Sequence, residues 1–238
     1  MKFLLELTHQ MNLKDKIVLA HKGYFNKESE KTYRENSKEV CEVSTTKDYI
    51  GIIELDVRKS KDGVLYCYHG TLIEYWFNLK IPQKFYDTKN KYGVNSLEEV
   101  LEVITDDKSI FLDIKSKSIT REDILNALKN KPFKEIILGN TGISSVSFLE
   151  RFYNMPKQFV KAMNGNIFCN FHDLKKLKEK NYKYFEVVFP FQISEKVVEN
   201  VRKNGLEFRC AGLFFMNGKS YFKKINRYNI KHISSDFI

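Results

Sequence analysis

Apolar runs alternate with helical segments along nearly all of the 238 residues, and this alternation predicts an α/β fold built on a parallel sheet. Eight runs have the length of buried strands when one further run, the return of a hairpin, is counted separately. Such an arrangement favours a sheet closed as a (β/α)8 TIM barrel. An open doubly wound sheet is the alternative, but no glycine-rich phosphate-binding turn follows the first run. The chain shows no linker and no repeat, so we expect residues 1–238 to form a single domain.

The first elements carry the clearest local signals. Ile17–His21 has the pattern of a short buried strand, and a helix over Glu39–Tyr49 leads into a second strand at Ile50–Val57. Ser60–Gly63 is a tight turn that is followed at once by the apolar run Val64–His69. Because a parallel crossover needs a dozen or more residues, this run can only form an antiparallel hairpin that extends the second strand.

The later elements alternate in the same way. Ser96, with Glu99 three positions later, has the pattern of a capping box at the start of a helix. Further strands are predicted at Ser109–Lys115, Ile143–Phe148, Gln158–Met163, Tyr184–Phe189, Leu206–Gly212 and Lys231–Ser235. Helices are predicted between them at Arg121–Lys129, Phe148–Asn154, Asp173–Lys180, Ser194–Asn204 and Lys219–Tyr228.

The chain is basic, with a formal net charge of +10. Its lysines and arginines are scattered and mixed with acidic residues, which is typical of a lysine-rich soluble surface. The same charge would also attract an anionic substrate such as a phosphodiester. None of the recognised nucleic-acid-binding modules is present, so we expect no nucleic-acid partner.

Cysteine usage and the N-terminal residues indicate a cytoplasmic protein. The cysteines are widely spaced, form no zinc or CxxC pattern and mostly lie among apolar residues, which is typical of buried free thiols: Cys41, Cys67, Cys169 and Cys210. Residues 1–12 lack the cleavage site of a signal peptide. No run of about 18 apolar residues occurs, so we expect no membrane insertion.

Two carboxylates on the second predicted strand are the strongest candidates for chemistry. Glu54 and Asp56 are two residues apart, so their side chains share one face of the strand. Two like charges on one face repel each other unless a cation or a proton lies between them. Asp113 likewise stands among apolar residues of a predicted strand, where a carboxylate needs a partner or a metal.

The carboxyl ends of parallel strands meet at one mouth of a barrel, where the active sites of this fold lie. Polar residues stand at or near these ends in several segments: His21, Lys22, Glu54, Asp56, His69, Asp113 and Lys115. Carboxylate oxygens favour Mg²⁺ or Ca²⁺, two histidines can exchange protons near neutral pH, and lysines can neutralise a phosphate. Together these groups predict metal-dependent cleavage of a phosphate ester.

The same residues carry a resemblance to a known family. Short motifs occur in the following order: HKG at His21–Gly23, REN at Arg34–Asn36, ELD at Glu54–Asp56, DG at Asp62–Gly63, HG at His69–Gly70, NSLEEVL at Asn95–Leu101, DIK at Asp113–Lys115, VSF at Val146–Phe148 and SSD at Ser234–Asp236. In this order and over nearly the whole chain, the sequence resembles the glycerophosphodiester phosphodiesterase family. The resemblance implies a (β/α)8 barrel that hydrolyses glycerophosphodiesters to glycerol 3-phosphate and an alcohol.

The resemblance also implies roles for individual residues. Acid/base catalysis would belong to His21 and His69, and a divalent metal to Glu54, Asp56 and Asp113. Glu35 and Asn36 match the family's EN motif and would lie near the substrate pocket, while the charges of Lys22 and Lys115 are suited to neutralise its phosphate.

This chain departs from the family pattern at several positions. Lys22 replaces the usual arginine, Gly70 an aspartate, Asp113 a glutamate and Ala211 a tryptophan, and the segment Thr71–Val94 is shorter than usual. Most of these changes concern substrate contacts rather than the catalytic core, Asp113 being the exception.

Two other functions stay open from the sequence. One is a catalytically degenerate phosphate-binding barrel, and the other is a lipid-directed phospholipase relative that acts at membrane surfaces. We expect a small-molecule phosphodiester as the partner. The sequence does not determine the alcohol of the substrate, the choice between Mg²⁺ and Ca²⁺, or the oligomeric state.

Overall fold

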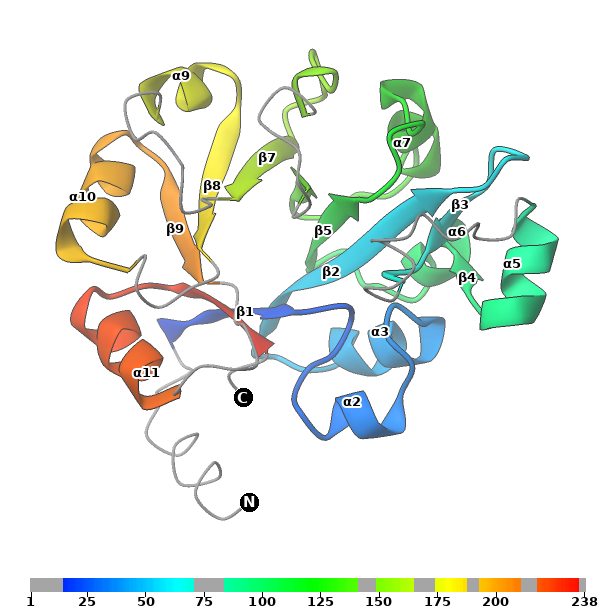
Figure 1. The fold of residues 1–238 in the computed structure, drawn as a ribbon, viewed down its shortest axis with the longest axis horizontal. Helices are drawn as coiled ribbons and strands as arrows, with labels where there is room; N and C mark the ends of the chain where they lie inside the picture. The colour runs from blue at the N-terminus through cyan, green and yellow to red at the C-terminus, as the bar shows by residue number, and fades with distance from the viewer. Residues whose placement is uncertain are drawn as a thin grey trace.

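The computed structural model describes residues 15–70, 84–140, 149–164, 174–187, 193–210 and 218–235. Within these ranges ten strands form one sheet in the order β1-β10-β9-β8-β7-β6-β5-β2-β3-β4, and a further pairing of β1 with β2 closes the sheet. Eight of the strands form the parallel barrel (Figure 1): β1 (Ile17–Ala20), β2 (Ile50–Lys59), β5 (Ser109–Ile114), β6 (Ile136–Gly139), β7 (Phe159–Asn164), β8 (Tyr182–Val187), β9 (Glu207–Cys210) and β10 (His232–Ser234). The predicted (β/α)8 TIM barrel is confirmed.

Helices lie around the outside of the ring of strands (Figure 1). In the described ranges they are α2 (Ser29–Thr32), α3 (Lys38–Thr45), α5 (Phe85–Tyr92), α6 (Leu97–Leu101), α7 (Arg121–Ala127), α9 (Leu174–Glu179), α10 (Glu195–Lys203) and α11 (Gly218–Arg227). The capping box predicted at Ser96 and Glu99 is present, with each side chain accepting a hydrogen bond from the other residue's backbone N–H.

The predicted hairpin is present as well. β3 (Leu65–Cys67) pairs antiparallel with the end of β2, and β4 (Asn95–Ser96) adds to its outer edge. Because Tyr68 donates its backbone N–H to the carbonyl of Asp56 at 2.9 Å, the hairpin return stays attached to β2 beyond the last ladder pair. This contact brings the segment that contains His69 close to the carboxylates of β2.

The fourth barrel strand differs from the sequence prediction. The sequence suggested a strand at Ile143–Phe148, which lies outside the described residues, whereas β6 pairs with β5 and β7 at Ile136–Gly139. Gly139 fits this strand because a Cβ there would lie only 2.2 Å from Cζ of Phe111 in the barrel interior. The motif residues Val146–Phe148, Ala211 and Asp236 also lie outside the described residues.

Two apolar layers hold the fold together. The interior of the barrel is filled by one small cluster, which consists of Leu19, Ile52, Phe111, Ile137, Ala162 and Tyr184. A larger cluster packs the outer faces of the strands against the surrounding helices. Since the interior is already filled with apolar side chains near its middle, polar groups that point inward collect toward the two ends of the barrel.

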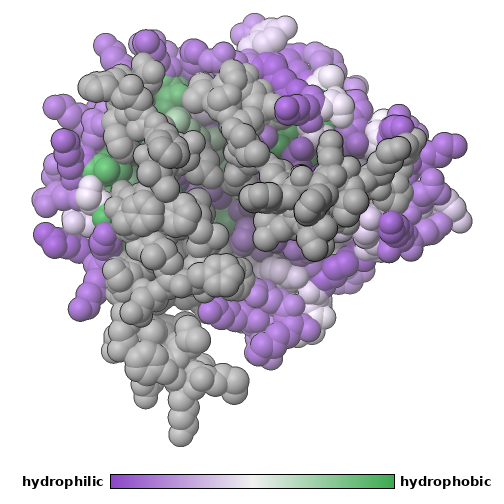
Figure 2. All heavy atoms as spheres, in the orientation of Figure 1, coloured by the Kyte–Doolittle hydropathy of each residue, from purple (hydrophilic) through white to green (hydrophobic). Residues whose placement is uncertain are grey.

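The surface is mainly hydrophilic where Figure 2 shows described residues, in keeping with the scattered lysines. Cys41, Cys67 and Cys210 are buried free thiols, as predicted for them. No helix among the described residues is both long enough and apolar enough to cross a membrane.

Candidate active site

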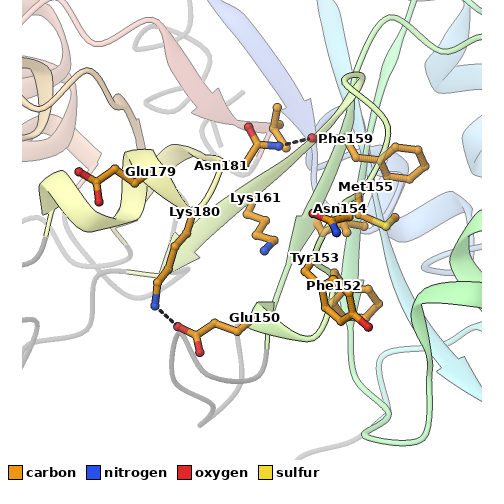
Figure 3. Close-up of a pocket in the computed structure, with 12 residues that line it drawn as sticks. Glu150, Phe152, Tyr153, Asn154, Met155, Phe159, Lys161, Glu179, Lys180 and Asn181 are labelled. Carbon is orange, nitrogen blue, oxygen red and sulfur yellow. Dashed lines mark hydrogen bonds and ion pairs between the residues drawn. The ribbon is translucent and has the colours of Figure 1, made fainter.

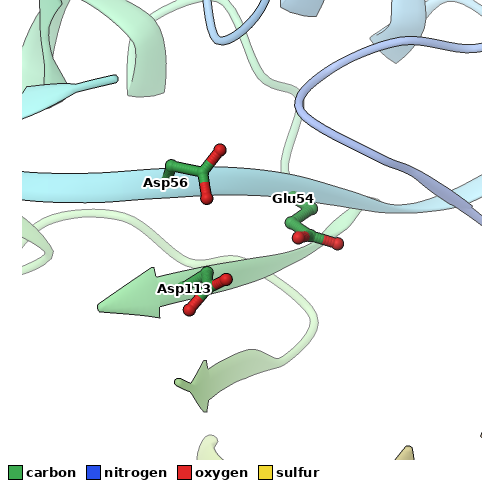
Figure 4. A group of neighbouring side chains, drawn as sticks. All are labelled: Glu54, Asp56 and Asp113. Atoms are coloured by element: carbon green, nitrogen blue, oxygen red, sulfur yellow. The ribbon is translucent and has the colours of Figure 1, made fainter. Parts of the chain in front are cut away.

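Three buried carboxylates gather on neighbouring strands toward the carboxyl ends of the barrel (Figure 4). Glu54 and Asp56 lie on β2, and Asp113 lies opposite Asp56 in the ladder between β2 and β5. Each offers an oxygen atom that lies within 4.8 Å of the corresponding atoms of the other two. Asp56 and Asp113 are each only 1% exposed and Glu54 is 5% exposed. These three side chains, expected to meet at the mouth of the barrel, lie together in the structure.

The pKa values of Glu54 and Asp56 are shifted in opposite directions. Removal from water, opposed by His21 and Arg209, raises the pKa of Glu54 to about 8. Burial acts in the same direction on Asp56, but Lys115, His69 and the amide of Asn36 outweigh it and lower the pKa of Asp56 to about 2. The ionised form of Asp56 is thus stabilised by nearby cations. Glu54 instead favours its protonated form unless a further positive charge is present.

Lys115 supplies much of the positive charge. Its ammonium lies 2.5 Å from Oδ2 of Asp113 and 3.1 Å from Oδ1 of Asp56, and its side chain is 12% exposed. Burial alone would lower the pKa of Lys115, but the two aspartates raise it. The lysine therefore stays charged and joins the two strands that hold the carboxylates.

A tight turn after β1 positions His21 and Lys22. The carbonyls of Ala20 and His21 accept backbone hydrogen bonds from Gly23 and Tyr24, and Lys22 and Gly23 have φ values of 55° and 83°. Glycine is needed at position 23 because of this φ and because a Cβ would lie 2.7 Å from Cγ1 of Val40.

The His21 side chain faces the carboxylate group from this turn. Its Nε2 lies 4.0 Å from Oε1 of Glu54, and its backbone N–H donates to the hydroxyl of Ser235 at 3.1 Å. Lys22 instead reaches Glu35, whose Oε2 is 3.0 Å from the lysine ammonium. Two residues that the sequence assigned separately to the substrate are thus an ion pair.

Asn36 connects this turn to the carboxylates. Its side-chain amide donates to Oδ2 of Asp56 at 2.9 Å and accepts the backbone N–H of the same residue at 2.8 Å. Its own backbone N–H donates to the carbonyl of Lys22 at 2.8 Å, and its φ is 58°. Asn36 is 1% exposed, so its amide does not face solvent but holds the Asp56 carboxylate in one orientation.

His69 approaches the group from the hairpin return. Its Nδ1 lies 2.8 Å from the carbonyl of Gly70, and because a carbonyl only accepts, this nitrogen carries the proton. Burial lowers the pKa of His69, and the nearest charges that act on it include Asp56, Lys22 and Lys115. Arg58 fixes the backbone here by donating to the carbonyls of Tyr68 and His69, at 2.9 and 2.6 Å.

The sequence prediction missed a second buried ionic pair at the same end of the barrel. Arg209 on β9 is 1% exposed, lies 2.6 Å from Oε2 of Glu186 on β8 and reaches to 3.5 Å from Oε2 of Glu54. Its guanidinium carbon stacks 4.2 Å from the ring centroid of Phe111. The signal was available, because Glu186 and Arg209, like Asp113, are charged residues inside apolar strand sequences.

Several solved structures of other proteins share this fold. A protein of Galdieria sulphuraria assigned as a glycerophosphodiester phosphodiesterase is 15% identical, covers 93% of this chain and 94% of its own, and has a TM-score of 0.74. In fold, the chain resembles glycerophosphodiester phosphodiesterases. The glycerophosphodiester phosphodiesterase of Agrobacterium tumefaciens gives 17% identity, 93% and 97% coverage and a TM-score of 0.65. A glycerophosphoryl diester phosphodiesterase of Parabacteroides distasonis gives 16%, 98% and 87%, and 0.60.

These likenesses establish the fold alone, because barrels of this kind carry many unrelated reactions. No protein-family model matches the sequence, and no curated protein matches it. Any argument about the reaction therefore depends on the side chains at the mouth of this barrel.

The donor set suits a hard divalent cation. Four buried carboxylates lie at this end of the barrel, Glu54, Asp56, Asp113 and Glu186, and their ion pairs with lysine or arginine in the part of the chain that the structure describes are with Lys115 and Arg209. A divalent ion would balance the remaining negative charge, and three oxygen donors at these separations leave positions for water or a ligand oxygen.

Proposed function

We propose that the protein hydrolyses a glycerophosphodiester, or a related diester of glycerol phosphate, to a glycerol phosphate and an alcohol in the presence of a divalent cation. The observation that supports this most is the group of three buried carboxylate oxygens within 4.8 Å of one another, with His21 beside it. The likeness in fold to glycerophosphodiester phosphodiesterases agrees with this choice of reaction.

Glu54, Asp56 and Asp113 would hold Mg²⁺ or Ca²⁺. When bound, such an ion polarises a phosphoryl oxygen and offsets the negative charge that develops on it. Asn36 keeps Asp56 in position, because it binds both the carboxylate and the backbone of that residue.

His69 is suited to act as the general base. Its Nδ1–H is held by a carbonyl, so Nε2 carries the free lone pair, and the lowered pKa favours this neutral form near pH 7. It would take the proton of the nucleophile, which is either a neighbouring hydroxyl of the glycerol or a water molecule. His21, close to the carboxylate of Glu54, would donate a proton to the alcohol oxygen as its bond to phosphorus breaks.

Lys22 and Lys115 would attract the phosphate. The Lys115 ammonium lies beside Asp56 and Asp113, and the Lys22 ammonium lies beside Glu35 on the neighbouring turn. Each acts as a point charge and lacks the two-pronged geometry with which arginine binds phosphate.

A substrate panel tests the proposal. Glycerophosphodiesters with different alcohols, nucleotide-linked glycerols and glycerol phosphate polymer fragments are incubated with Mg²⁺ or Ca²⁺, with and without a chelator. We expect at least one compound to release a glycerol phosphate, and the chelator to abolish this release. Hydrolysis that is equally fast with the chelator would remove the cation from the proposal.

The nucleophile can be identified separately. If a glycerol hydroxyl attacks, a cyclic phosphate forms first and an analogue without that hydroxyl is inert. Rapid hydrolysis of the analogue would instead assign the attack to water.

One observation favours a second candidate, a barrel that binds phosphate without cleaving it. Lys115 already neutralises Asp56 and Asp113 as a buried ammonium at 3.1 and 2.5 Å. Binding of panel compounds with no release of product under any metal condition would favour this candidate over the hydrolase.

A further inference from the structure

A cavity of about 520 Å³ lies outside the barrel at the amino ends of β7 and β8 (Figure 3). The cavity is lined mainly by the start of β7, the turn before β7, and the end of α9 with the turn that follows α9. It therefore lies at the opposite end of the barrel strands from Glu54, Asp56 and Asp113. A volume of this size lies in the range that encloses a small organic ligand.

The ammonium group of Lys161 is the unusual feature of this cavity. Figure 3 shows the Lys161 side chain directed into the space enclosed by the lining residues. The residue is 7% exposed, its backbone N–H donates to the carbonyl of Asn181 at 3.0 Å, and its ammonium forms no ion pair with an acidic residue in the described ranges. Its ammonium lies 5.6 Å from the centroid of the Tyr182 ring.

A buried cation without an anionic partner is costly. Burial lowers the pKa of Lys161, with the charges of Glu150 and Lys180 acting in opposite directions on it. Glu150 does not pair with Lys161, because its carboxylate is bound to the ammonium of Lys180 across the cavity (Figure 3). Among the described residues the Lys161 ammonium thus has no paired carboxylate, and a bound anion would supply one.

The lining around this ammonium mixes apolar and charged residues, because Glu150, Glu179 and Lys180 line the cavity as well. Phe152 and Phe159 are almost fully buried, and Met155 is partly buried against the same core. Tyr153 stands at the rim with 65% of its surface exposed. Phe152 and Phe159 therefore present almost no surface, so Tyr153 and Met155 are the apolar side chains that a ligand held by Lys161 would contact.

We propose that this cavity binds a small organic anion whose phosphate or carboxylate group pairs with Lys161 and whose apolar part packs against Tyr153 and Met155. The site is separate from the carboxylate group at the barrel mouth and does not depend on the function proposed for that mouth.

Calorimetric titration of the metal-free protein with phenyl phosphate, benzoate and inorganic phosphate tests the proposal. We expect at least one of the aromatic anions to bind more tightly than inorganic phosphate, and the comparison of phenyl phosphate with benzoate identifies the preferred anionic group. K161M keeps the aliphatic part of the side chain and removes the charge. It should weaken binding about tenfold or more, because a hydrogen bond to a charged group is lost.

Two further variants separate this site from others. K157M removes an exposed lysine of the same turn region and should leave affinity unchanged. E150Q removes a carboxylate whose charge acts on Lys161 and should tighten anion binding, which is the opposite sign from K161M. Thermal unfolding of K161M without ligand should occur at the wild-type temperature or higher, because an unpaired buried charge has been removed.

The proposal is wrong if none of the three probes binds the wild-type protein. It is equally wrong if K161M, shown to be folded by circular dichroism, binds them as tightly as the wild-type protein does. Should K161M not fold, a failure of E150Q to tighten binding would overturn it.

Discussion

Replacement of Lys115 by methionine probes the charge balance of the candidate active site. The Lys115 ammonium lies 2.5 Å from Asp113 and 3.1 Å from Asp56, and both aspartates are 1% exposed. Removing one partner of a buried ion pair costs about 3–5 kcal/mol. A chain of this size loses about 2–4 °C of Tm for each kcal/mol, so the Tm of metal-free K115M should fall by about 6–20 °C.

A divalent cation should reverse much of this loss. In K115M the ion would neutralise carboxylates that have lost their ammonium, so it should stabilise the variant more than the wild-type protein. For scale, a ligand at 100 times its Kd stabilises the native state by about 2.7 kcal/mol. Differential scanning calorimetry with chelator, and with saturating Mg²⁺ or Ca²⁺, measures the Tm difference between the two proteins in each state.

K183M is the matched control. Lys183 is a partly buried lysine at the amino end of the barrel, 2.7 Å from Glu135 and away from the carboxylate group. Its Tm deficit should be the same with chelator and with metal. The reasoning fails if adding metal does not reduce the Tm difference between K115M and the wild-type protein. It also fails if metal reduces the Tm differences of K115M and K183M by the same amount.

Four other outcomes follow from the structure. H21A and H69A should each lower kcat/KM by at least ~100-fold without loss of metal binding, and near-normal activity in either would remove that residue from the acid/base pair. Because the pKa of His69 is lowered, its neutral form, and with it kcat/KM, should be lost only as the pH falls below about 6.5. A pH profile in which kcat/KM already falls above that value would contradict the assignment of His69 as the base. R209M leaves two buried carboxylates without their shared guanidinium and should cost about 3–5 kcal/mol in denaturant unfolding, whereas an unchanged midpoint would show that the pair is not needed for stability. G139A places a methyl group 2.2 Å from the ring of Phe111 and should cost about 1–3 kcal/mol, while wild-type stability would mean that the ring can move aside.

The fold could be predicted from the sequence except where a short segment is a strand only because it pairs with its neighbours. β2 and β5 are long apolar runs with a clear ending, so their sequences alone indicate strands. β6 has only the four residues Ile136–Gly139, and it is a strand because β5 and β7 offer ladders on both sides. A run this short has no period that separates a strand from a loop.

The site could be predicted in part for a similar reason. Strand alternation and apolar neighbours identified Glu54, Asp56 and Asp113, because both signals are local. The contact of Arg209 with Glu54 joins positions 155 residues apart across the barrel, so no local pattern contains it. The ion pair of Lys22 with Glu35 likewise depends on how two turns dock.

The position of a bound cation tests the account most directly. Crystals grown with Mn²⁺, which scatters anomalously, would show where a divalent ion binds in the absence of substrate. The account predicts one strong anomalous peak within about 2.0–2.6 Å of an oxygen from each of Glu54, Asp56 and Asp113. The absence of a peak there, or a peak held by other residues, would contradict it.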